Sequence, residues 1–396
     1  MNVLIIHSSQ IIQNASSGII RVSALLGNIF QKHNHRCFNA YYKDSNGEPV
    51  FEHSIKLTPT TEVEQLRKAC IDWDIDVLIS QMYPTADTAR MLTNLHKAVE
   101  NIKRPLIVEC CHNCPYIEIR GYDMHYLRFL IGYPSMKIAL RFKKIIWGMA
   151  CMLLPYIMNK IIAKRYQRVI DQTDKFVLLS DKFMERVKKF QNLREGQLEF
   201  ANNPETYTEC LAPCDLNMKD KSILIIARLE ENQKRLSYCF EMWKELQKDS
   251  RFNDWRLDVV GDGYDAGYYK QMVKRLNLQN VTFYGNQDPI EWYRKSQIML
   301  MTSAYEGWGM TLIEAQSMGV VPIVFNSYES LSDVVDDGIN GCIVPNRDKK
   351  AFLNQWRQLM LNDKLRKEIQ LNCLKSTGRF SEDVIYQQWM NIIDCK

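Results

Sequence analysis

Two glutamates flank a glycine-rich stretch in the last third of the chain. Glu306 and Glu314 stand eight positions apart, and Gly307 and Gly309 follow the first of them. Such glycines let a ligand approach the backbone closely, and the amides at a following helix start attract an anion such as a phosphate. Carboxylates accept hydrogen bonds from hydroxyls rather than from phosphates. The pattern predicts a ligand that carries both groups, such as a sugar nucleotide; the alternative is that Glu306 caps the helix and Glu314 is solvated.

Two cations lie near another predicted strand end. Arg228 follows the apolar run 222–227, and Lys234 stands at the head of a helical pattern. Arginine can bind two phosphate oxygens at once, and lysine adds a point charge. The pair predicts a diphosphate clamp, in which Arg235 is an alternative to Lys234. Solvated loop charges are the other interpretation.

His112 follows the apolar run 105–109. It therefore lies at the carboxyl end of a predicted strand, where ligands bind in open α/β sheets; a structural histidine is the alternative. Cys110, Cys111 and Cys114 surround it, but neighbouring residues that leave a strand point to opposite faces. Because no second Cys/His pair lies nearby, we expect no metal site.

Strand ends and helix starts must position these residues, and the chain alternates between the two. Helical patterns follow apolar runs throughout, which predicts parallel α/β structure. The runs lie at 3–7, 76–80, 105–109, 177–180, 222–227, 256–260, 281–285 and 298–301. The loop 16–18 after the first run contains Gly18 but no Gly-x-Gly-x-x-Gly pattern, so a dinucleotide-binding dehydrogenase loses support.

Length and composition bound the class of protein. The 396 residues suffice for two domains, and 46% hydrophobic with 24% charged residues is ordinary globular composition. Residues 1–7 lack the basic and apolar regions of a signal peptide. Twelve irregularly spaced cysteines are typical of reduced core residues. We expect a cytoplasmic protein.

The stretch 303–315 resembles the Glu-x7-Glu motif of the retaining glycosyltransferases of family 4, and 320–341 resembles its continuation. Segment 228–235 is similar to the family's diphosphate motif. It departs from it in two ways: Ala227 replaces the usual glycine, and Lys234 stands one residue farther from Arg228.

The resemblance implies the GT-B fold, in which two doubly wound Rossmann-like α/β domains face each other across a cleft. The expected boundaries are an acceptor-side domain at 1–205, a linker at 206–221, a nucleotide-sugar domain at 222–377 and a helix at 378–396 that crosses back to the first domain. The implied reaction is retaining transfer of a hexose from a nucleotide diphosphate sugar, UDP rather than GDP, to a glycan or lipid-linked acceptor. Such a reaction serves cell-surface polysaccharide or lipopolysaccharide assembly.

The resemblance also implies roles for individual residues. Arg228 and Lys234 would neutralise the leaving diphosphate, and Glu306 and His112 would hold the donor sugar; these four are the expected catalytic residues. Glu314 would bind the ribose. No cofactor or metal is expected. The expected donor-binding residues are Gly18, Arg228, Lys234, Gly307, Trp308, Gly309, Met310, Thr311 and Glu314.

Two rival functions fit the same residues. A sugar-nucleotide 2-epimerase of this fold would act on a soluble substrate, and a non-catalytic glycan- or membrane-binding protein would keep the fold alone.

Basic residues are concentrated between Asp123 and Asp171. Nine Lys or Arg and no acidic residue lie there, around the uncharged, mostly apolar stretch 145–159. That stretch is too short to span a bilayer, which needs about 20 residues. No nucleic-acid motif accompanies the charge. The pattern predicts contact with an anionic membrane surface through about 124–170, at the inner face of the cytoplasmic membrane; solvated core helices are the alternative.

Overall fold

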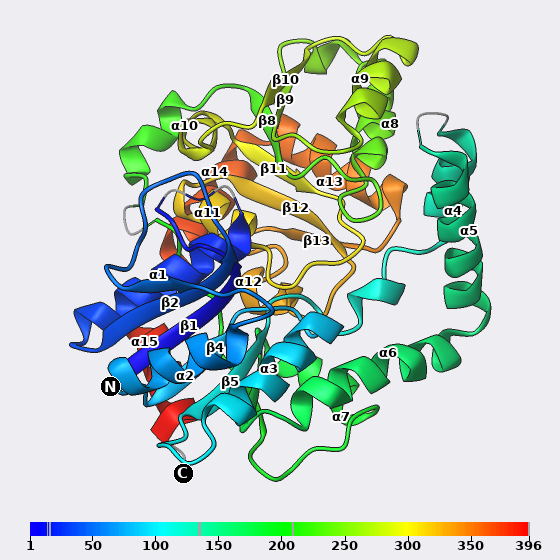
Figure 1. Cartoon of the computed structure of the whole chain (residues 1–396). Helices are drawn as coiled ribbons and strands as arrows, with labels where there is room; N and C mark the ends of the chain where they lie inside the picture. The colour runs from blue at the N-terminus through cyan, green and yellow to red at the C-terminus, as the bar shows by residue number, and fades with distance from the viewer. Residues whose placement is uncertain (14, 16, 134–135, 208–209, 395–396) are drawn as a thin grey trace. The chain divides into compact units, whose positions relative to one another are not determined.

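The computed structural model describes residues 1–13, 15, 17–133, 136–207 and 210–394 (Figure 1). Ser16 of the predicted first loop, and residues 134–135, 208–209 and 395–396, lie outside the described residues. The chain forms two compact units. Unit 1 comprises Met1–Tyr116, Asn159–Thr206 and Phe380–Lys396, and unit 2 comprises Ile117–Met158 and Tyr207–Arg379.

Unit 1 is built on a seven-stranded parallel sheet in the order β3-β2-β1-β4-β5-β6-β7. The order runs outward in both directions from β1, as in a doubly wound fold. Val3 to Ile6 in β1 are fully buried, because the central strand is covered on both faces. The strands are β1 Asn2–Ser9, β2 Arg36–Lys43, β3 Ser54–Lys56, β4 Val77–Ser80, β5 Leu106–Cys111, β6 Lys175–Leu178 and β7 Leu198–Phe200.

Helices connect these strands. The helices α2 and α3 lie side by side (Figure 1), and Phe30 of α1 packs on Trp389 of α15 with ring centroids 6.1 Å apart. Their bounds are α1 Gly18–Lys32, α2 Glu62–Asp72, α3 Ala86–Ala98, α7 Met184–Lys188 and α15 Glu382–Asp394. The helix α6, Pro155–Ile170, begins in unit 2 and continues into unit 1.

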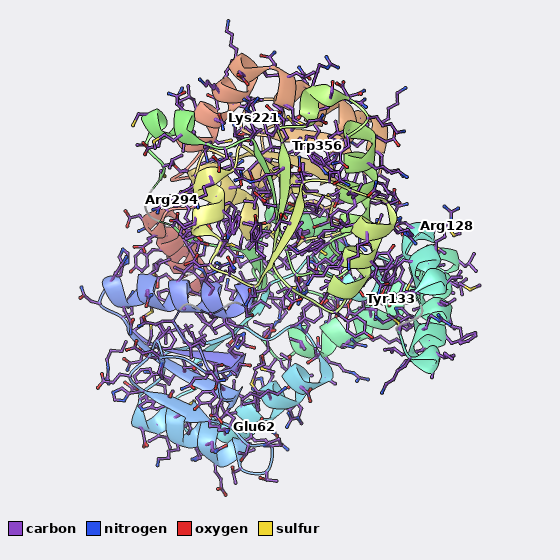
Figure 2. The ribbon with its side chains drawn as sticks, turned by 90° about the horizontal axis from the view of Figure 1, so that it is seen from above. Glu62, Arg128, Tyr133, Lys221, Arg294 and Trp356 are labelled. Atoms are coloured by element: carbon purple, nitrogen blue, oxygen red, sulfur yellow. The ribbon has the colours of Figure 1, made fainter. Side chains whose placement is uncertain are left out.

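Unit 2 contains a six-stranded parallel sheet in the order β10-β9-β8-β11-β12-β13. Its core includes stacked Trp243 and Trp356, whose ring centroids lie 5.6 Å apart; Trp356 is labelled in Figure 2. The strands are β8 Ser222–Ile226, β9 Arg256–Val260, β10 Val281–Gly285, β11 Ile298–Met301, β12 Val321–Asn326 and β13 Cys342–Pro345. The helices are α8 Leu236–Leu246, α9 Ala266–Arg275, α10 Ile290–Lys295, α11 Met310–Ser317, α12 Leu331–Val334, α13 Lys349–Leu361 and α14 Asp363–Lys375.

One stretch differs from the expected domain boundaries. Residues 117–158, which the sequence places in a first domain of 1–205, group with unit 2. They form α4, Met124–Gly132, and α5, Ile138–Leu153, which run side by side (Figure 1). The reason is a set of contacts with distant residues: Asp123 pairs with Arg235 at 2.8 Å, and Phe129 packs edge-on against Tyr268. Phe380 to the end of the chain groups with unit 1.

Candidate functional site

The glycine-rich loop joins β11 to α11 in unit 2. Gly309 is the N-cap of α11 and has φ +84°, a left-handed conformation that glycine adopts without strain. A Cβ at this position would also lie 2.9 Å from the Tyr328 hydroxyl. The first amides of a helix have no partner within it. Because Met310 and Thr311 form the first turn, their amides mark the anion-binding end that the sequence predicts.

The loop before α8 is bound directly to this glycine-rich loop. The Ala304 amide donates to the Gln233 carbonyl at 2.6 Å, and the Thr302 hydroxyl donates to the carbonyls of Lys234 and Arg235 at 3.1 and 3.0 Å. Thr302 is buried. These hydrogen bonds join the two loops, so that basic side chains of the loop before α8 lie beside a carboxylate of the glycine-rich loop.

Lys234 and Glu306 form the centre of this structure. Lys234 Nζ lies 2.6 Å from Glu306 Oε1, and both side chains are mostly buried. An ammonium has three N–H donors, so Lys234 can bind Glu306 and a phosphate oxygen at the same time. The carboxylate oxygens of Glu306 have further lone pairs, so they can also accept hydrogen bonds from sugar hydroxyls.

Arg228 lies beside this pair and is more exposed. Its guanidinium contacts Glu230 at 3.0 Å and donates to Gln233 Oε1 at 3.1 Å. The Gln233 amide in turn donates to Glu306 Oε2 at 3.2 Å. Gln233 therefore links the three charged groups, Arg228, Lys234 and Glu306, in one network.

The structure distinguishes between Lys234 and Arg235. Arg235 is buried, adopts φ +51°, pairs with Asp123 at 2.8 Å and donates to the Gly121 carbonyl at 3.1 Å. The hydrogen bonds of the Arg235 guanidinium therefore go to partners within unit 2. Lys234 is the cation of the two that lies at the glycine-rich loop.

Gly261 and Gly263 have a structural use at this site. A Cβ at Gly261 would lie 2.0 Å from the Ala227 carbonyl oxygen, and one at Gly263 would lie 2.6 Å from the Leu229 backbone. The Leu229 amide donates to the Asp262 carbonyl at 3.0 Å. The two glycines therefore allow the β9 turn to pack on the backbone that carries Arg228.

Glu314 is buried in α11 rather than solvated, and Glu306 does not cap that helix. Glu314 Oε2 accepts a hydrogen bond from the Tyr293 hydroxyl at 2.8 Å. Both alternatives that make these glutamates ordinary surface residues are therefore wrong. Trp308, between them, is buried as well, and the Gly307 carbonyl accepts from Ser330 at 2.9 Å.

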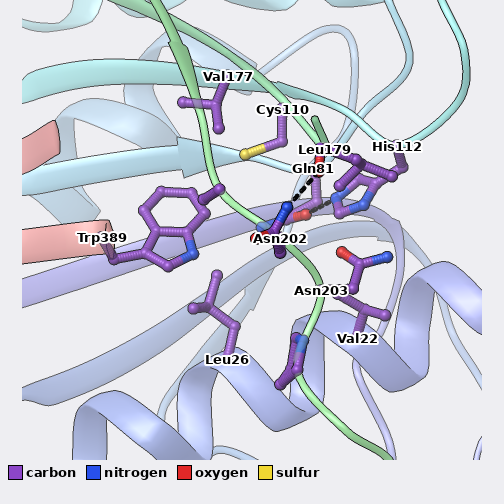
Figure 3. Close-up of a pocket in the computed structure, with 12 residues that line it drawn as sticks. Val22, Leu26, Gln81, Cys110, His112, Val177, Leu179, Asn202, Asn203 and Trp389 are labelled. Atoms are coloured by element: carbon purple, nitrogen blue, oxygen red, sulfur yellow. Dashed lines mark hydrogen bonds between the residues drawn. The ribbon is translucent and has the colours of Figure 1, made fainter. Parts of the chain in front are cut away.

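His112 lies in unit 1, directly after β5, and lines a small pocket (Figure 3). Its Nε2 donates to Gln81 Oε1. Burial, helped by nearby His7, lowers the pKa of His112 to about 3. The imidazole is therefore neutral at pH 7 and can accept or donate a hydrogen bond, but it carries no charge toward a phosphate.

The rest of the pocket comes from distant parts of unit 1. Val22 and Leu26 of α1, Asn202, Asn203 and Trp389 of α15 line it (Figure 3). The Asn202 side chain donates to the Leu179 carbonyl at 2.8 Å and accepts from Gln388 of α15 at 2.9 Å. The C-terminal helix thus completes the pocket that contains His112.

Gly18, the remaining predicted donor contact, is the first residue of α1 and is exposed. A Cβ there would meet nothing within 4 Å, so packing does not require a glycine at this position. Its proposed contact with a donor stays a prediction.

Within the described ranges, no group of three or more His, Cys, Asp or Glu side chains is arranged to hold a metal ion. Cys110, Cys111 and Cys114 are buried thiols near His112. Burial raises the pKa of the Cys110 thiol well above its ordinary value, so it stays protonated.

Sequence reasoning missed three residues that organise these sites. Gln233, Tyr293 and Gln81 each hold a predicted functional side chain through a hydrogen bond. Gln233 adjoins Lys234 in sequence, which is a usable signal. Tyr293 and Gln81 lie 21 and 31 positions from their partners, and nothing in the spacing connects them.

Comparison with known proteins adds independent findings. Residues 212–374 match the family model described as glycosyl transferases group 1. The chain is 26% identical over 178 residues to the amylovoran biosynthesis glycosyltransferase AmsD of Erwinia amylovora, which covers 44% of this chain and 49% of that protein. It is 27% identical over 186 residues to a lipopolysaccharide 1,6-galactosyltransferase of Salmonella typhimurium, covering 45% and 50%. The chain thus spans about half the length of these relatives.

Solved structures match along the whole chain. The structure of Anabaena Alr3699/HepE in complex with UDP-glucose matches with a TM-score of 0.72 and 13% identity, covering 100% of both chains. The apo form of the lipopolysaccharide outer core galactosyltransferase WaaB matches with a TM-score of 0.65 and 18% identity, covering 100% of this chain and 99% of the other. At these identities the likeness shows the fold, and it confirms the predicted GT-B class with two Rossmann-like α/β domains.

Proposed function

We propose that this chain, whose residues 212–374 carry the glycosyl transferases group 1 domain within a GT-B fold, transfers a hexose from a nucleotide diphosphate sugar. The donor would be a UDP-sugar, and the acceptor a glycan or a lipid-linked glycan of cell-surface polysaccharide assembly. The transfer would retain the anomeric configuration. The proposed location is peripheral, at the inner face of the cytoplasmic membrane.

The observation that carries this proposal is the network of Arg228, Gln233, Lys234 and Glu306 beside the start of α11. It places two cations and helix-start amides where a diphosphate would bind, and a carboxylate next to them where hydroxyls would bind. A sugar nucleotide diphosphate carries both kinds of group, with hydroxyls on its sugar and on its ribose.

The chemistry follows from where charge develops. As the bond between the sugar C1 and the phosphate oxygen breaks, negative charge grows on the diphosphate. Arg228, Lys234 and the amides of the first α11 turn would stabilise that charge, because they are fixed in place before the reaction. Glu306 would hold sugar hydroxyls and Glu314 the ribose. The acceptor hydroxyl oxygen would bond to C1 on the face that the diphosphate leaves, and the leaving phosphate would take the proton of that hydroxyl.

His112 would contribute a neutral hydrogen bond to the sugar from unit 1. Its low pKa supports this role, since a neutral imidazole can pair with a hydroxyl without a charge to desolvate. Gln81 fixes the ring by accepting from Nε2.

Relatives support the finer parts of the proposal. UDP-glucose is bound in the HepE structure. One relative is named as an amylovoran biosynthesis glycosyltransferase and another as a lipopolysaccharide 1,6-galactosyltransferase. These likenesses favour a UDP-sugar over a GDP-sugar and a polysaccharide acceptor over a small one.

A donor panel tests the proposal. The protein is incubated with UDP- and GDP-sugars, with and without lipid-linked glycan, and products are followed by nucleotide release and by NMR. Release of UDP together with a new glycoside of retained configuration supports retaining transfer. An isomerised donor would show an epimerase, and no turnover across the panel would show a binding protein; either result overturns the proposal.

A further inference from the structure

An apolar stripe runs along the exposed side of α5. Five large side chains lie on it at spacings of three or four residues, so they share one face of the helix. Three of them, Phe142, Ile146 and Leu153, are 60%, 66% and 72% exposed. The five are Ile138, Phe142, Ile146, Met149 and Leu153.

The other side of α5 already has its partner. Ile145 and Met152 pack against a cluster formed by α4 and the residues that follow it, including Phe129 and Tyr133. Gly148 is buried, and a Cβ there would lie 2.7 Å from Tyr122. The stripe is therefore an additional apolar face and not the core face of the helix.

This exposure is concentrated in one part of the chain. Of the 20 large hydrophobic side chains that are exposed among the described residues, 12 lie between Met124 and Ile161. Monomeric soluble proteins seldom gather exposed apolar side chains in this way without a binding function.

Positive charge accompanies the stripe. Three basic side chains nearby are exposed: Arg128 on α4, Lys137 just before α5, and Lys143 on α5. Arg128 is labelled in Figure 2. Residues 124–170 contain no Asp or Glu in the sequence. A surface with apolar side chains and cations, and no acidic residue in the segment, is complementary to anionic headgroups over acyl chains.

We infer that the hairpin formed by α4 and α5 is the surface through which this protein docks on an anionic membrane, with the α5 stripe inserted among the lipids. A second copy of the chain fits less well, because a symmetric contact would bring the same cations against one another. No single helix in the described part of the chain is long and apolar enough to cross a membrane; the α5–α6 pair passes that test only when both helices are taken together.

The hairpin is fixed to the loop that carries Lys234. Asp123 pairs with Arg235 at 2.8 Å and with Arg347 at 2.9 Å, and His125 pairs with buried Glu231 at 2.6 Å. Docking of the hairpin would thus hold the candidate donor site close to the lipid surface. This consequence rests on the proposed function, whereas lipid binding by the hairpin does not.

Vesicle flotation of the full chain tests the inference. Neutral phosphatidylcholine vesicles are compared with vesicles of equal phosphatidylcholine and phosphatidylglycerol, without any donor. The wild type is compared with two variants: the stripe variant combines Phe142→Ser, Ile146→Ser and Leu153→Ser, and the charge variant combines Arg128→Gln, Lys137→Gln and Lys143→Gln. The matched controls are Ile339→Ser, Leu361→Ser and Leu371→Ser combined, and Lys244→Gln, Lys248→Gln and Lys270→Gln combined, all exposed positions of unit 2.

We expect the wild type and both controls to float with anionic vesicles and to bind less in high salt, because salt screens the charge. Both hairpin variants should partition about 10- to 100-fold more weakly, since interfacial binding strength depends on the apolar area buried in the lipid and on the attraction of basic residues to anionic headgroups. All variants should show the wild-type circular dichroism and melting temperature.

Equal flotation of the stripe variant and the wild type would overturn the inference. So would a wild-type dimer that the stripe variant converts to a monomer without vesicles, which would assign the stripe to a second copy. Nucleotide release from a UDP-sugar, measured in parallel, separates failure of docking from failure of the proposed function.

Discussion

At the scale of single residues, the candidate site depends on one ion pair held between two loops. Lys234 and Glu306 come from segments 72 positions apart and meet at 2.6 Å. Sequence patterns predicted both side chains as functional from their place at strand-to-helix junctions. They did not predict the pairing, because it requires Thr302 and Ala304 to bond to the backbone of residues 233–235.

Removing any charged member of this network should lower turnover sharply. We expect Arg228→Ala, Lys234→Ala and Glu306→Ala each to reduce kcat/KM about 10²- to 10³-fold, the usual effect of deleting one group that stabilises developing charge. Steady-state nucleotide release measures this. The control is Glu291→Gln, which changes an exposed carboxylate paired with Arg294. Near-wild-type rates in all three variants would refute the site.

A buried carboxyl in unit 1 gives a prediction about pH. Glu109 is fully buried in β5, and burial raises its pKa well above the ordinary value, opposed weakly by Ser80. The unfolded chain therefore releases this proton at lower pH than the folded chain does. The contribution of Glu109 to the free energy of unfolding is therefore fully present below about pH 4.5, the ordinary pKa of a glutamate. It decreases as the pH rises from there toward the higher pKa of the folded protein.

Glu109→Gln should remove that loss. Between pH 4 and pH 7.5, we expect the free energy of unfolding of Glu109→Gln to fall less than that of the wild type. Urea denaturation at several pH values measures the slope of the free energy of unfolding against pH. Glu64→Gln, at the start of α2, should leave it unchanged. An identical slope in Glu109→Gln and wild type would show that Glu109 is ionised in the folded protein.

At the scale of elements, sequence patterns predicted individual strands and helices better than they predicted which elements pack against one another. The bounds of β11 coincide with the apolar run predicted at 298–301. The strand β2 was not predicted, because Arg36 and Lys43 end it and buried Asn39 interrupts its apolar run. Asn39 is tolerated since its amide donates to the Ile5 carbonyl at 3.1 Å.

The assignment of residues 117–158 to unit 2 could not be predicted either. Helical periodicity shows that α4 and α5 each have an apolar face, but not which domain that face contacts. The decisive contacts join Asp123 to Arg235 and His125 to Glu231, more than 100 positions apart. Charges of this kind are ordinary surface residues in the sequence and become structural only in the fold.

Gly261 fixes how the β9 turn supports the Arg228 loop. We expect Gly261→Ala to destabilise the protein by about 1–3 kcal/mol, because its φ of +130° and the nearby Ala227 carbonyl both exclude a Cβ. The comparison is Gly267→Ala, which has open space inside α9 and should stabilise by about 0.5–1 kcal/mol. Chemical denaturation of both variants checks this. Equal free energies of unfolding for Gly261→Ala and Gly267→Ala would contradict this prediction, because they would show that the β9 turn accommodates a Cβ without cost.

At the scale of the whole molecule, each unit contributes a different part of the proposed function. Unit 2 carries the cations, the glycine-rich loop and the hairpin with its apolar stripe. Unit 1 carries the His112 pocket, which the C-terminal helix completes. The expectation that the two domains face each other across a cleft comes from the family resemblance and stays a prediction.

Turnover should not depend on a divalent metal. The clamp supplies the positive charge of Arg228 and Lys234 to the diphosphate, which is the task a bound divalent ion performs in other transferases. We expect the same rate of nucleotide release, within about twofold, with EDTA and with added magnesium or manganese. Loss of activity in EDTA that either ion restores would contradict this prediction.

The most direct test of the central claim is calorimetric titration of UDP into the wild type, Lys234→Ala and Lys221→Ala. Lys221, which is labelled in Figure 2, is an exposed lysine of unit 2 that pairs with Asp254. Its removal therefore controls for the loss of one positive charge. If Lys234 binds the diphosphate, the dissociation constant should rise about tenfold or more in Lys234→Ala and stay near the wild-type value in Lys221→Ala, as removal of a charge-assisted contact to phosphate requires. Equal UDP affinity in all three proteins would contradict the assignment of the diphosphate site to the loops that carry Lys234 and Glu306.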